Sequence, residues 1–326
     1  KILEENAANT RDQQVLLTLQ QLLSTEKDPG KLMKIQLDIR NIESRLRQTD
    51  EKRSGLIEQI ESFTGRKLIT YFSIHGSLDN RDARIVEDFI LSNKLDRFDI
   101  LVDSPGGITD ASEKLIEICR RRTKNGSEFD YRVIVVGQAK SAATLFALGS
   151  KKILLCESAE LGPVDPQIAV FTTAGEMIRD SAHQIYYASK EYLDETRRHW
   201  LRKSAGDLLL LSKYDPVAIE RARVAIKHTE DIIAKRIYTN PFLIAEYPEA
   251  GKGVQDDLKI FIDHRESSYS HGRAIYYETL SEFGFTRNKF IQKFDDFYLT
   301  DENRSSPDVK KVNEILWELY IRSLEV

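Results

Sequence analysis

The chain has 326 residues, of which 48 are Lys or Arg and 52 are Asp or Glu, so its formal net charge is −4. Its length allows one large or two small domains, and 41% hydrophobic residues are enough to build a core. The negative net charge argues against a protein that binds nucleic acid by neutralising phosphates.

The sequence has few features of a membrane protein or of a disulfide-bonded protein. No apolar run reaches the roughly 18 residues that a membrane span needs, and no signal peptide is visible. We therefore expect a cytoplasmic protein, with membrane contact only if an anchor precedes residue 1. Cys119 and Cys156 stand in apolar settings typical of packed thiols in a reducing compartment. The histidines lack metal-ligand spacing, so we expect neither a metal nor a cofactor.

Residues 1–63 predict a helical arm. Asp28, Pro29 and Gly30 form a turn between two helical patterns. Apolar residues repeat three and four positions apart on both sides of this turn, and they include Val15, Leu19, Leu22, Ile39, Ile42, Leu46, Leu56 and Ile60. We expect an antiparallel helical hairpin that also contacts a partner. Packing against the chain's own body is the alternative, because so short a seam does not determine oligomeric state.

Residues 64–288 predict an α/β body. Strand patterns alternate with helical ones, as in a parallel sheet, and the predicted strands are residues 68–72, 99–102, 132–136 and 152–155. Residues 173–240 predict helices, including an amphipathic one that begins at Pro216. Residues 289–326 predict a helical C-terminal tail whose last helix spans 309–324.

Two strand-to-helix turns in this body carry chemical signals. The first reads Asp103-Ser104-Pro105-Gly106-Gly107, and a glycine pair there allows a sharp turn with exposed N–H groups. In the second, the strand that ends near Val136 leads to Ser141, followed by small residues. A serine at such a turn, beside backbone donors, is typical of a nucleophile with an oxyanion hole. Each signal alone is also typical of a tight turn or a helix cap.

Taken together, these motifs resemble the Clp/crotonase superfamily of serine peptidases. The segment Leu161-Gly162-Pro163-Val164-Asp165-Pro166-Gln167 resembles a signature of its serine dehydrogenase proteinase branch, which is related to signal peptide peptidase A. Ser270-His271-Gly272-Arg273-Ala274-Ile275 resembles a second segment of that branch, with Ala274 in place of the usual proline. The resemblance covers roughly residues 66–288 and implies a ClpP/crotonase-like fold in a prokaryotic protein.

The resemblance implies that Ser141 is the nucleophile. The N–H groups of Gly106 or Gly107, together with that of Ala142, would then form the oxyanion hole. Ser104 is the competing serine, and its place within the turn favours a role in organising that turn.

The general base is less clear from the sequence. Residues 161–167, where the Clp subunit would have its histidine, contain none, so a Clp-type triad is absent as such. Signal peptide peptidase A and its relatives use a lysine instead, which burial must make basic. Lys190 is the first candidate and Lys227 the second, while Lys140 is expected to point elsewhere. His271 is a third candidate because its motif belongs to the branch.

Asp165 and Gln167 have two interpretations. In the first, they orient the base or line the substrate cleft. In the second, Pro163 and Pro166 form a rigid turn that Asp165 caps.

We therefore expect a serine endopeptidase of the Ser–Lys type that self-associates and acts on a peptide or protein. The substrate is expected to add as a strand beside residues 99–102. Two alternatives stay open: a crotonase-like enzyme acting on an acyl-CoA thioester, and a non-catalytic scaffold.

Overall fold

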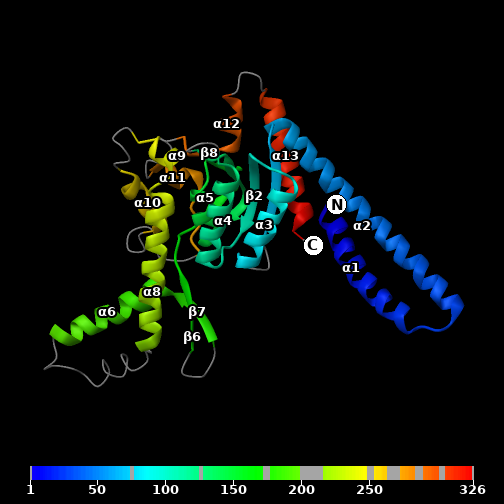
Figure 1. The fold of residues 1–326 in the computed structure, drawn as a ribbon, viewed down its shortest axis with the longest axis horizontal. Coiled ribbons are helices and arrows are strands. Elements are labelled where there is room, and N and C mark those ends of the chain that lie inside the picture. The colour runs from blue at the N-terminus through cyan, green and yellow to red at the C-terminus, as the bar shows by residue number, and fades with distance from the viewer. Residues whose placement is uncertain are drawn as a thin grey trace.

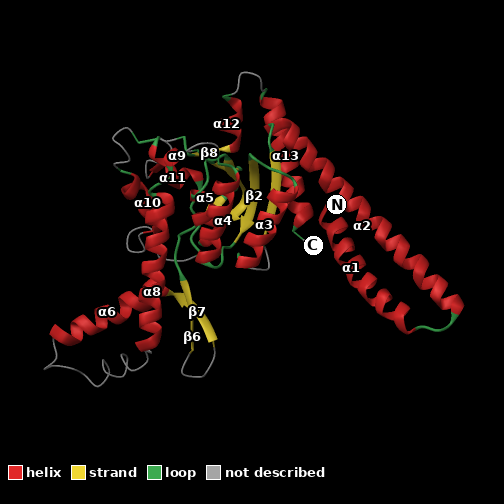
Figure 2. Cartoon of the chain, viewed as in Figure 1, coloured by secondary structure: helices red, strands yellow, loops and turns green. Residues whose placement is uncertain are grey.

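The protein is described by a computed structural model over residues 2–73, 77–124, 128–171, 177–198, 216–247, 253–262, 272–282, 289–300 and 305–324. An α/β body occupies the centre, and a helical arm and a smaller side unit project from it (Figures 1 and 2). Among the described helices, none is both long enough and apolar enough to cross a membrane.

The main sheet is parallel, and the predicted strands of the body are confirmed. Its order is β1 (Lys67–Phe72), β2 (Phe98–Ser104), β3 (Tyr131–Ala139), β4 (Ile153–Leu155) and β8 (Ile291–Lys293). The two-residue strand β5 (Glu160–Leu161) pairs with the last residues of β3. Strand β8, from the C-terminal part of the chain, therefore completes the sheet beside β4.

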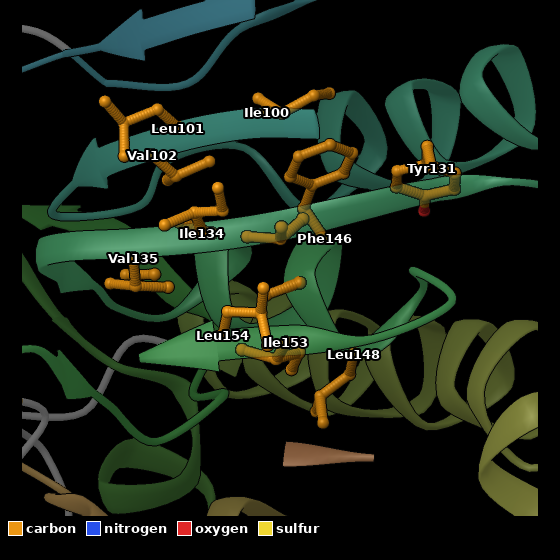
Figure 3. Close-up of a cluster of buried hydrophobic side chains, with 14 of the residues drawn as sticks. Ile100, Leu101, Val102, Tyr131, Ile134, Val135, Phe146, Leu148, Ile153 and Leu154 are labelled. Atoms are coloured by element: carbon orange, nitrogen blue, oxygen red, sulfur yellow. The ribbon is translucent and has the colours of Figure 1, made fainter. Parts of the chain in front are cut away.

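The core lies between this sheet and its helices. Strand β2 is buried along its whole length because both of its faces are covered, as is usual in a parallel sheet. Side chains of the central strands meet Phe146 and Leu148 of α5 (Ala142–Leu148) (Figure 3). Helices α3 (Asn80–Ser92) and α4 (Thr109–Arg122) pack against each other, and α4 packs on α5. Each large apolar side chain buried here contributes about 1.5–3 kcal/mol to stability.

The predicted antiparallel hairpin of the arm is present. Helices α1 (Ile2–Thr25) and α2 (Pro29–Thr64) lie side by side, linked by Arg45 and Asp12 at 2.6 Å (Figure 1). The Asp28 carboxylate accepts the Lys31 N–H and caps α2, which explains why the helical pattern breaks there. Towards its C-terminal end α2 buries Ile60 in the main core and packs beside α13 (Ser306–Ser323). That part of the arm packs on the body, and contact of the remainder with a partner stays a prediction.

The side unit contains a hairpin that the sequence analysis missed. Strands β6 (Gln167–Phe171) and β7 (Met177–Ser181) pair antiparallel and pack with α6 (Ala182–Arg198) and α8 (Pro216–Ile232) around a small separate core. The prediction of helices throughout residues 173–240 is therefore wrong for residues 177–181. So short a segment has little conformational preference of its own, and pairing with β6 decides its structure.

The remaining described helices come from the C-terminal third of the chain. They are η2 (Ile233–Ile237), α9 (Pro241–Ile244), α10 (Val254–Ile262), α11 (Tyr277–Glu282) and α12 (Phe294–Leu299). Helix α12 packs on α13 and on β4, so the C-terminal part of the chain covers one side of the sheet.

A buried ionic cluster ties the start of β2 to its neighbours. Asp99, which is fully buried, accepts hydrogen bonds from Arg66 at 2.7 Å and from Arg132 at 2.8 and 2.5 Å. Arg132 also donates to the Tyr298 hydroxyl at 2.8 Å. These contacts link β2, β3 and α12 in the interior, where a charge without a partner is costly.

Replacing Asp99 with Ala is expected to destabilise the fold by about 3–5 kcal/mol, because the buried Arg132 guanidinium then has no carboxylate partner. The control is Glu220→Ala, which removes an exposed partner of Arg223 and should leave the melting temperature nearly unchanged. Thermal unfolding followed by circular dichroism measures both. Equal losses in the two variants would contradict the importance of the cluster.

Candidate active site

The Gly106-Gly107 turn packs directly against Ser141. Gly106 has φ +102°, and a Cβ atom placed on it would lie 2.5 Å from the Lys140 carbonyl oxygen and 2.8 Å from Ser141 Cβ. Its N–H donates to Ser104 Oγ at 3.2 Å. The predicted role of Ser104 in organising the turn is consistent with this bond. Only glycine can occupy this position without moving the chain.

Ser141 itself has a strained backbone. It lies between β3 and α5 with φ 52° and ψ −118°, a conformation that costs a non-glycine residue about 1–3 kcal/mol. Its neighbours hold it in place: the Lys140 N–H donates to the Ser104 carbonyl at 3.1 Å, and the Leu145 N–H donates to the Ser141 carbonyl at 3.0 Å. Ser141 is 9% exposed, so its side chain lies at the edge of the solvent.

Two backbone donors beside Ser141 have no acceptor. They are the N–H groups of Gly107 and Ala142, neither of which donates a hydrogen bond to any described residue. The position of a Cβ on Gly106 would be 3.2 Å from Ala142 N, so the turn and the start of α5 adjoin. Of the two glycines that the sequence analysis named, Gly106 already donates to Ser104. Gly107 and Ala142 can therefore supply the pair of donors that an oxyanion needs.

The Leu161–Gln167 segment is held against the turn that contains Ser141. Thr144 Oγ1 contacts the Ala139 carbonyl at 2.6 Å and the Gly162 carbonyl at 2.9 Å, and it lies 3.2 Å from the Gly162 N. Leu161 forms an antiparallel bridge with Ile275, so two of the motifs singled out in the sequence meet in space. His271, the candidate base in the second motif, lies outside the described residues.

A buried aspartate–histidine pair follows this segment. Asp165 Oδ1 lies 2.8 Å from His183 Nδ1, and the two residues are 3% and 8% exposed. The Ala182 N–H donates to the Pro166 carbonyl at 2.9 Å, which holds the start of α6 against the segment. The sequence analysis missed His183, although it offered Asp165 as a residue that orients the base. With Nδ1 toward the carboxylate, Nε2 is the ring nitrogen on the side away from Asp165.

A cleft of about 630 Å³ opens at Ser141. Gly106, Gly107, Pro166 and Gln167 line it, together with Arg179 of β7. Pro166 directly follows Asp165 in the chain, and its carbonyl accepts the N–H of Ala182, which directly precedes His183. Among the described residues, no group of three or more His, Cys, Asp or Glu side chains could hold a metal ion.

A second histidine faces the same cleft. His228 Nε2 on α8 contacts Asp110 Oδ1 on α4 at 2.5 Å, and both residues line the cleft. Their side chains are 46% and 64% exposed, so water competes for this contact. The Asp165–His183 pair is buried and holds its imidazole more firmly.

The lysine candidates lie at the surface. Lys190 is exposed on α6, and Lys227 is exposed on α8. Lys140 pairs with Glu160 at 2.6 Å and donates to the Gly272 carbonyl, so it points elsewhere as expected. A lysine acts as a base only where burial disfavours its charged form, and neither exposed lysine has such surroundings.

The predicted place for a substrate strand is wrong. Strand β2 lies between β1 and β3 and pairs with both, so neither of its edges can accept another chain. Strand β6 differs, because among the described strands it pairs with β7 alone. Its residues Gln167 and Ala169 line the cleft that contains Ser141.

The fold and site define an α/β protein with a strained serine at a strand-to-helix turn and unpartnered N–H groups beside it. The sequence profile of the ClpP-like SDH-type serine proteinases matches residues 16–186, more than half of the chain. The chain belongs to this family.

Individual relatives match over shorter stretches. Uncharacterized protein MJ0137 of Methanocaldococcus jannaschii is 36% identical over 73 residues, which are 22% of this chain and 24% of that protein. Uncharacterized protein MJ1495 of the same organism is 31% identical over 99 residues, 30% of each chain. The chain thus matches less than a third of the length of either relative.

Two solved structures of the 1510-N membrane-bound stomatin-specific protease are also similar, one of them in complex with a substrate peptide. They are 16% and 15% identical in sequence and cover 52% of this chain and 71% and 75% of theirs, each with a TM-score of 0.28. Similarity at this level transfers no residue role to this chain.

Gly106→Ala is expected to lower the melting temperature, because the new Cβ would overlap the Lys140 carbonyl and meet an unfavourable positive φ. Gly55→Ala is the matched control, since nothing lies within 4 Å of that position inside α2. The same substitution there should stabilise the chain by about 0.5–1 kcal/mol. Calorimetry shows whether the two changes have opposite signs, and a Gly106→Ala variant as stable as the parent would contradict the packing described.

Proposed function

We propose that this protein is a serine peptidase that cleaves peptide bonds through an acyl-enzyme on Ser141. Ser141 Oγ attacks the scissile carbonyl carbon and gives its proton to a base. The carbonyl oxygen becomes an oxyanion that accepts the Gly107 and Ala142 N–H groups, each worth about 3 kcal/mol of barrier. The base then protonates the leaving amine, and water hydrolyses the acyl-enzyme. The observation that carries this proposal is the strained Ser141 beside two unpartnered donors.

For the general base we favour His183, oriented by Asp165. Three features support this choice: the pair is buried, its contact with the carboxylate uses Nδ1, and Asp165 directly precedes Pro166, which lines the cleft. In a serine–histidine–aspartate site the carboxylate orients the imidazole and stabilises the imidazolium that forms. Lys190 is the competing candidate, and His271 is a third. A Ser–Lys mechanism would need Lys190 to leave the solvent.

The substrate is proposed to bind as an extended peptide on the open edge of β6. This edge runs from the cleft at Gln167, so a peptide paired with it would pass Ser141. Backbone pairing of this kind recognises peptides with little dependence on side chains. A peptide or protein is therefore the substrate class that the site favours.

Self-association is proposed through the arm. Leu17, Met33 and Leu37 are exposed on α1 and α2 at 63%, 76% and 58%, away from the body. Apolar side chains gathered on a projecting hairpin favour burial against another chain. A second copy of the same chain is the partner that the family resemblance implies.

The nucleophile is tested with a fluorophosphonate probe, which forms a stable adduct on an activated serine. We expect one adduct, mapped by mass spectrometry to Ser141, and its loss in Ser141→Ala together with the loss of casein cleavage. Ser104→Ala is the control for the competing serine and should keep some labelling at Ser141. An unlabelled parent protein would contradict the peptidase and favour a scaffold. Coenzyme A binding in that case would favour the acyl-CoA alternative.

The base is tested by comparing His183→Ala with Lys190→Ala. We expect the first to slow labelling of Ser141 by about 10²–10⁴-fold, the usual range for a missing general base, and the second to leave it unchanged. Circular dichroism checks that both variants fold, and added imidazole should partly restore labelling in His183→Ala. The opposite pattern, with loss only in Lys190→Ala, would establish a Ser–Lys enzyme.

A further inference from the structure

The dipeptide Asp103-Ser104, at the end of β2, contacts both halves of the site. Asp103 Oδ1 accepts the Gln138 N–H at 2.7 Å, and the Ser104 carbonyl accepts the Lys140 N–H at 3.1 Å. Ser104 Oγ accepts the Gly106 N–H. Ser141 directly follows Lys140 in the chain. Its position therefore depends on the side chains of Asp103 and Ser104 and on the Ser104 carbonyl.

Strand β3 bulges at this point. Val102 pairs with Val135, but Ser104 pairs with Ala139, so β3 accommodates two extra residues opposite β2. Gly137 lies in the bulge, and a Cβ on it would be 2.7 Å from Asp103 Oδ1 and 2.9 Å from the Tyr320 hydroxyl. The bulge redirects β3 just before Ser141, as bulges do next to active sites.

Tyr320 reaches this bulge from the C-terminal helix α13. Its hydroxyl lies beside the Asp103 carboxylate, because a Cβ on Gly137 would meet both groups. Its ring packs 5.8 Å from that of Phe72 on β1 and 5.2 Å from that of Trp317 on α13, measured between centroids. The hydroxyl thus has a fixed direction rather than the freedom of a surface side chain.

We propose that Tyr320 is a positioning residue for Ser141, acting through Asp103 and the bulge of β3. This inference rests on the proposed function, because it assigns Tyr320 a role in the chemistry of that site. Asp103 is 2% exposed, and each oxygen of so buried a carboxylate needs a donor. Gln138 supplies one, and the Tyr320 hydroxyl is a second donor group that lies beside the carboxylate. Loss of this hydroxyl would let the carboxylate shift, and the peptide at Gln138 would move with it.

Burial favours the neutral form of both partners. It raises the pKa of the Asp103 carboxyl above its usual value, while the Gln138 N–H and the Tyr320 hydroxyl oppose that rise. It also raises the pKa of Tyr320 to about 12, so the phenol keeps its proton at neutral pH.

Helix α13 also contacts the arm. The Arg53 guanidinium of α2 donates to the Arg322 carbonyl at the end of α13, and α13 packs on α2, α12 and β3. One helix thus lies between the arm and the bulge that precedes Ser141. The arm and the nucleophile are joined through Tyr320 over a path of direct contacts.

The experiment measures inactivation by a fluorophosphonate probe in Tyr320→Phe, which keeps the ring and removes only the hydroxyl. We expect the maximal inactivation rate to fall about tenfold, as small misplacements of a nucleophile do. The probe concentration for half-maximal rate should be unchanged. The control is Tyr298→Phe, which removes another buried hydroxyl that bonds to Arg132, away from the turn. That variant should lose stability without losing rate.

A double-mutant cycle identifies the route. If Tyr320 acts through Asp103, Tyr320→Phe should change the rate little in an Asp103→Asn background. Additive losses, or a Tyr320→Phe rate equal to that of the parent or of Tyr298→Phe, would overturn the inference. A parent protein that the probe does not label would instead overturn the proposed function, so the two failures are distinguishable.

Discussion

The unfavourable backbone of Ser141 is the constraint on which the candidate site depends. A residue with φ 52° exposes its side chain at the tip of a turn, but the conformation costs about 1–3 kcal/mol. The hydrogen bonds around it, from Lys140 to Ser104, from Leu145 to Ser141 and from Thr144 to Ala139, contribute about 0.5–1.5 kcal/mol each. Together they are sufficient to hold the strained form. Gly106 is required at the same place, because any Cβ would occupy the space of Ser141.

The part of the site that the sequence predicts is the part built by local chain chemistry. Gly106, Gly107, Ser141 and Ala142 lie in two turns that follow buried strands, and parallel strands end at the same edge of a sheet. Apolar runs followed by turn residues therefore predict both the sheet and the convergence of these turns. What the sequence could not resolve was which glycine N–H remains unpartnered. That depends on the rotamer of Ser104, which engages Gly106 and leaves Gly107.

The Asp165–His183 pair was not predicted from the sequence, and the reason is physical. The two residues meet because β6 and β7 form a hairpin between them, and the β7 segment has too little preference of its own to be recognised as a strand. Reading residues 173–240 as helices separated His183 from Asp165. A search for a second strand that could bring the chain back from Gln167 would have offered the missing signal. The predicted position of the substrate beside β2 was likewise inferred from one strand without its neighbours. Both edges of β2 are occupied, by β1 and by β3.

The C-terminal residues contribute to the catalytic sheet at several levels. Strand β8 extends the sheet beside β4, Tyr298 of α12 joins the buried Asp99–Arg132 cluster, and Tyr320 of α13 meets Asp103. Asp99 and Asp103 stand near opposite ends of the same strand, and both depend on donors from beyond it. A parallel strand covered on both faces cannot solvate its carboxylates with water, so the chain must bring hydrogen-bond donors to them. Arginines of the body do this at the start of β2. At its end, beside Ser141, the Gln138 N–H does so, and the hydroxyl of a tyrosine from the last helix lies alongside. The surroundings of the site are therefore complete only when the last helix has packed on the sheet.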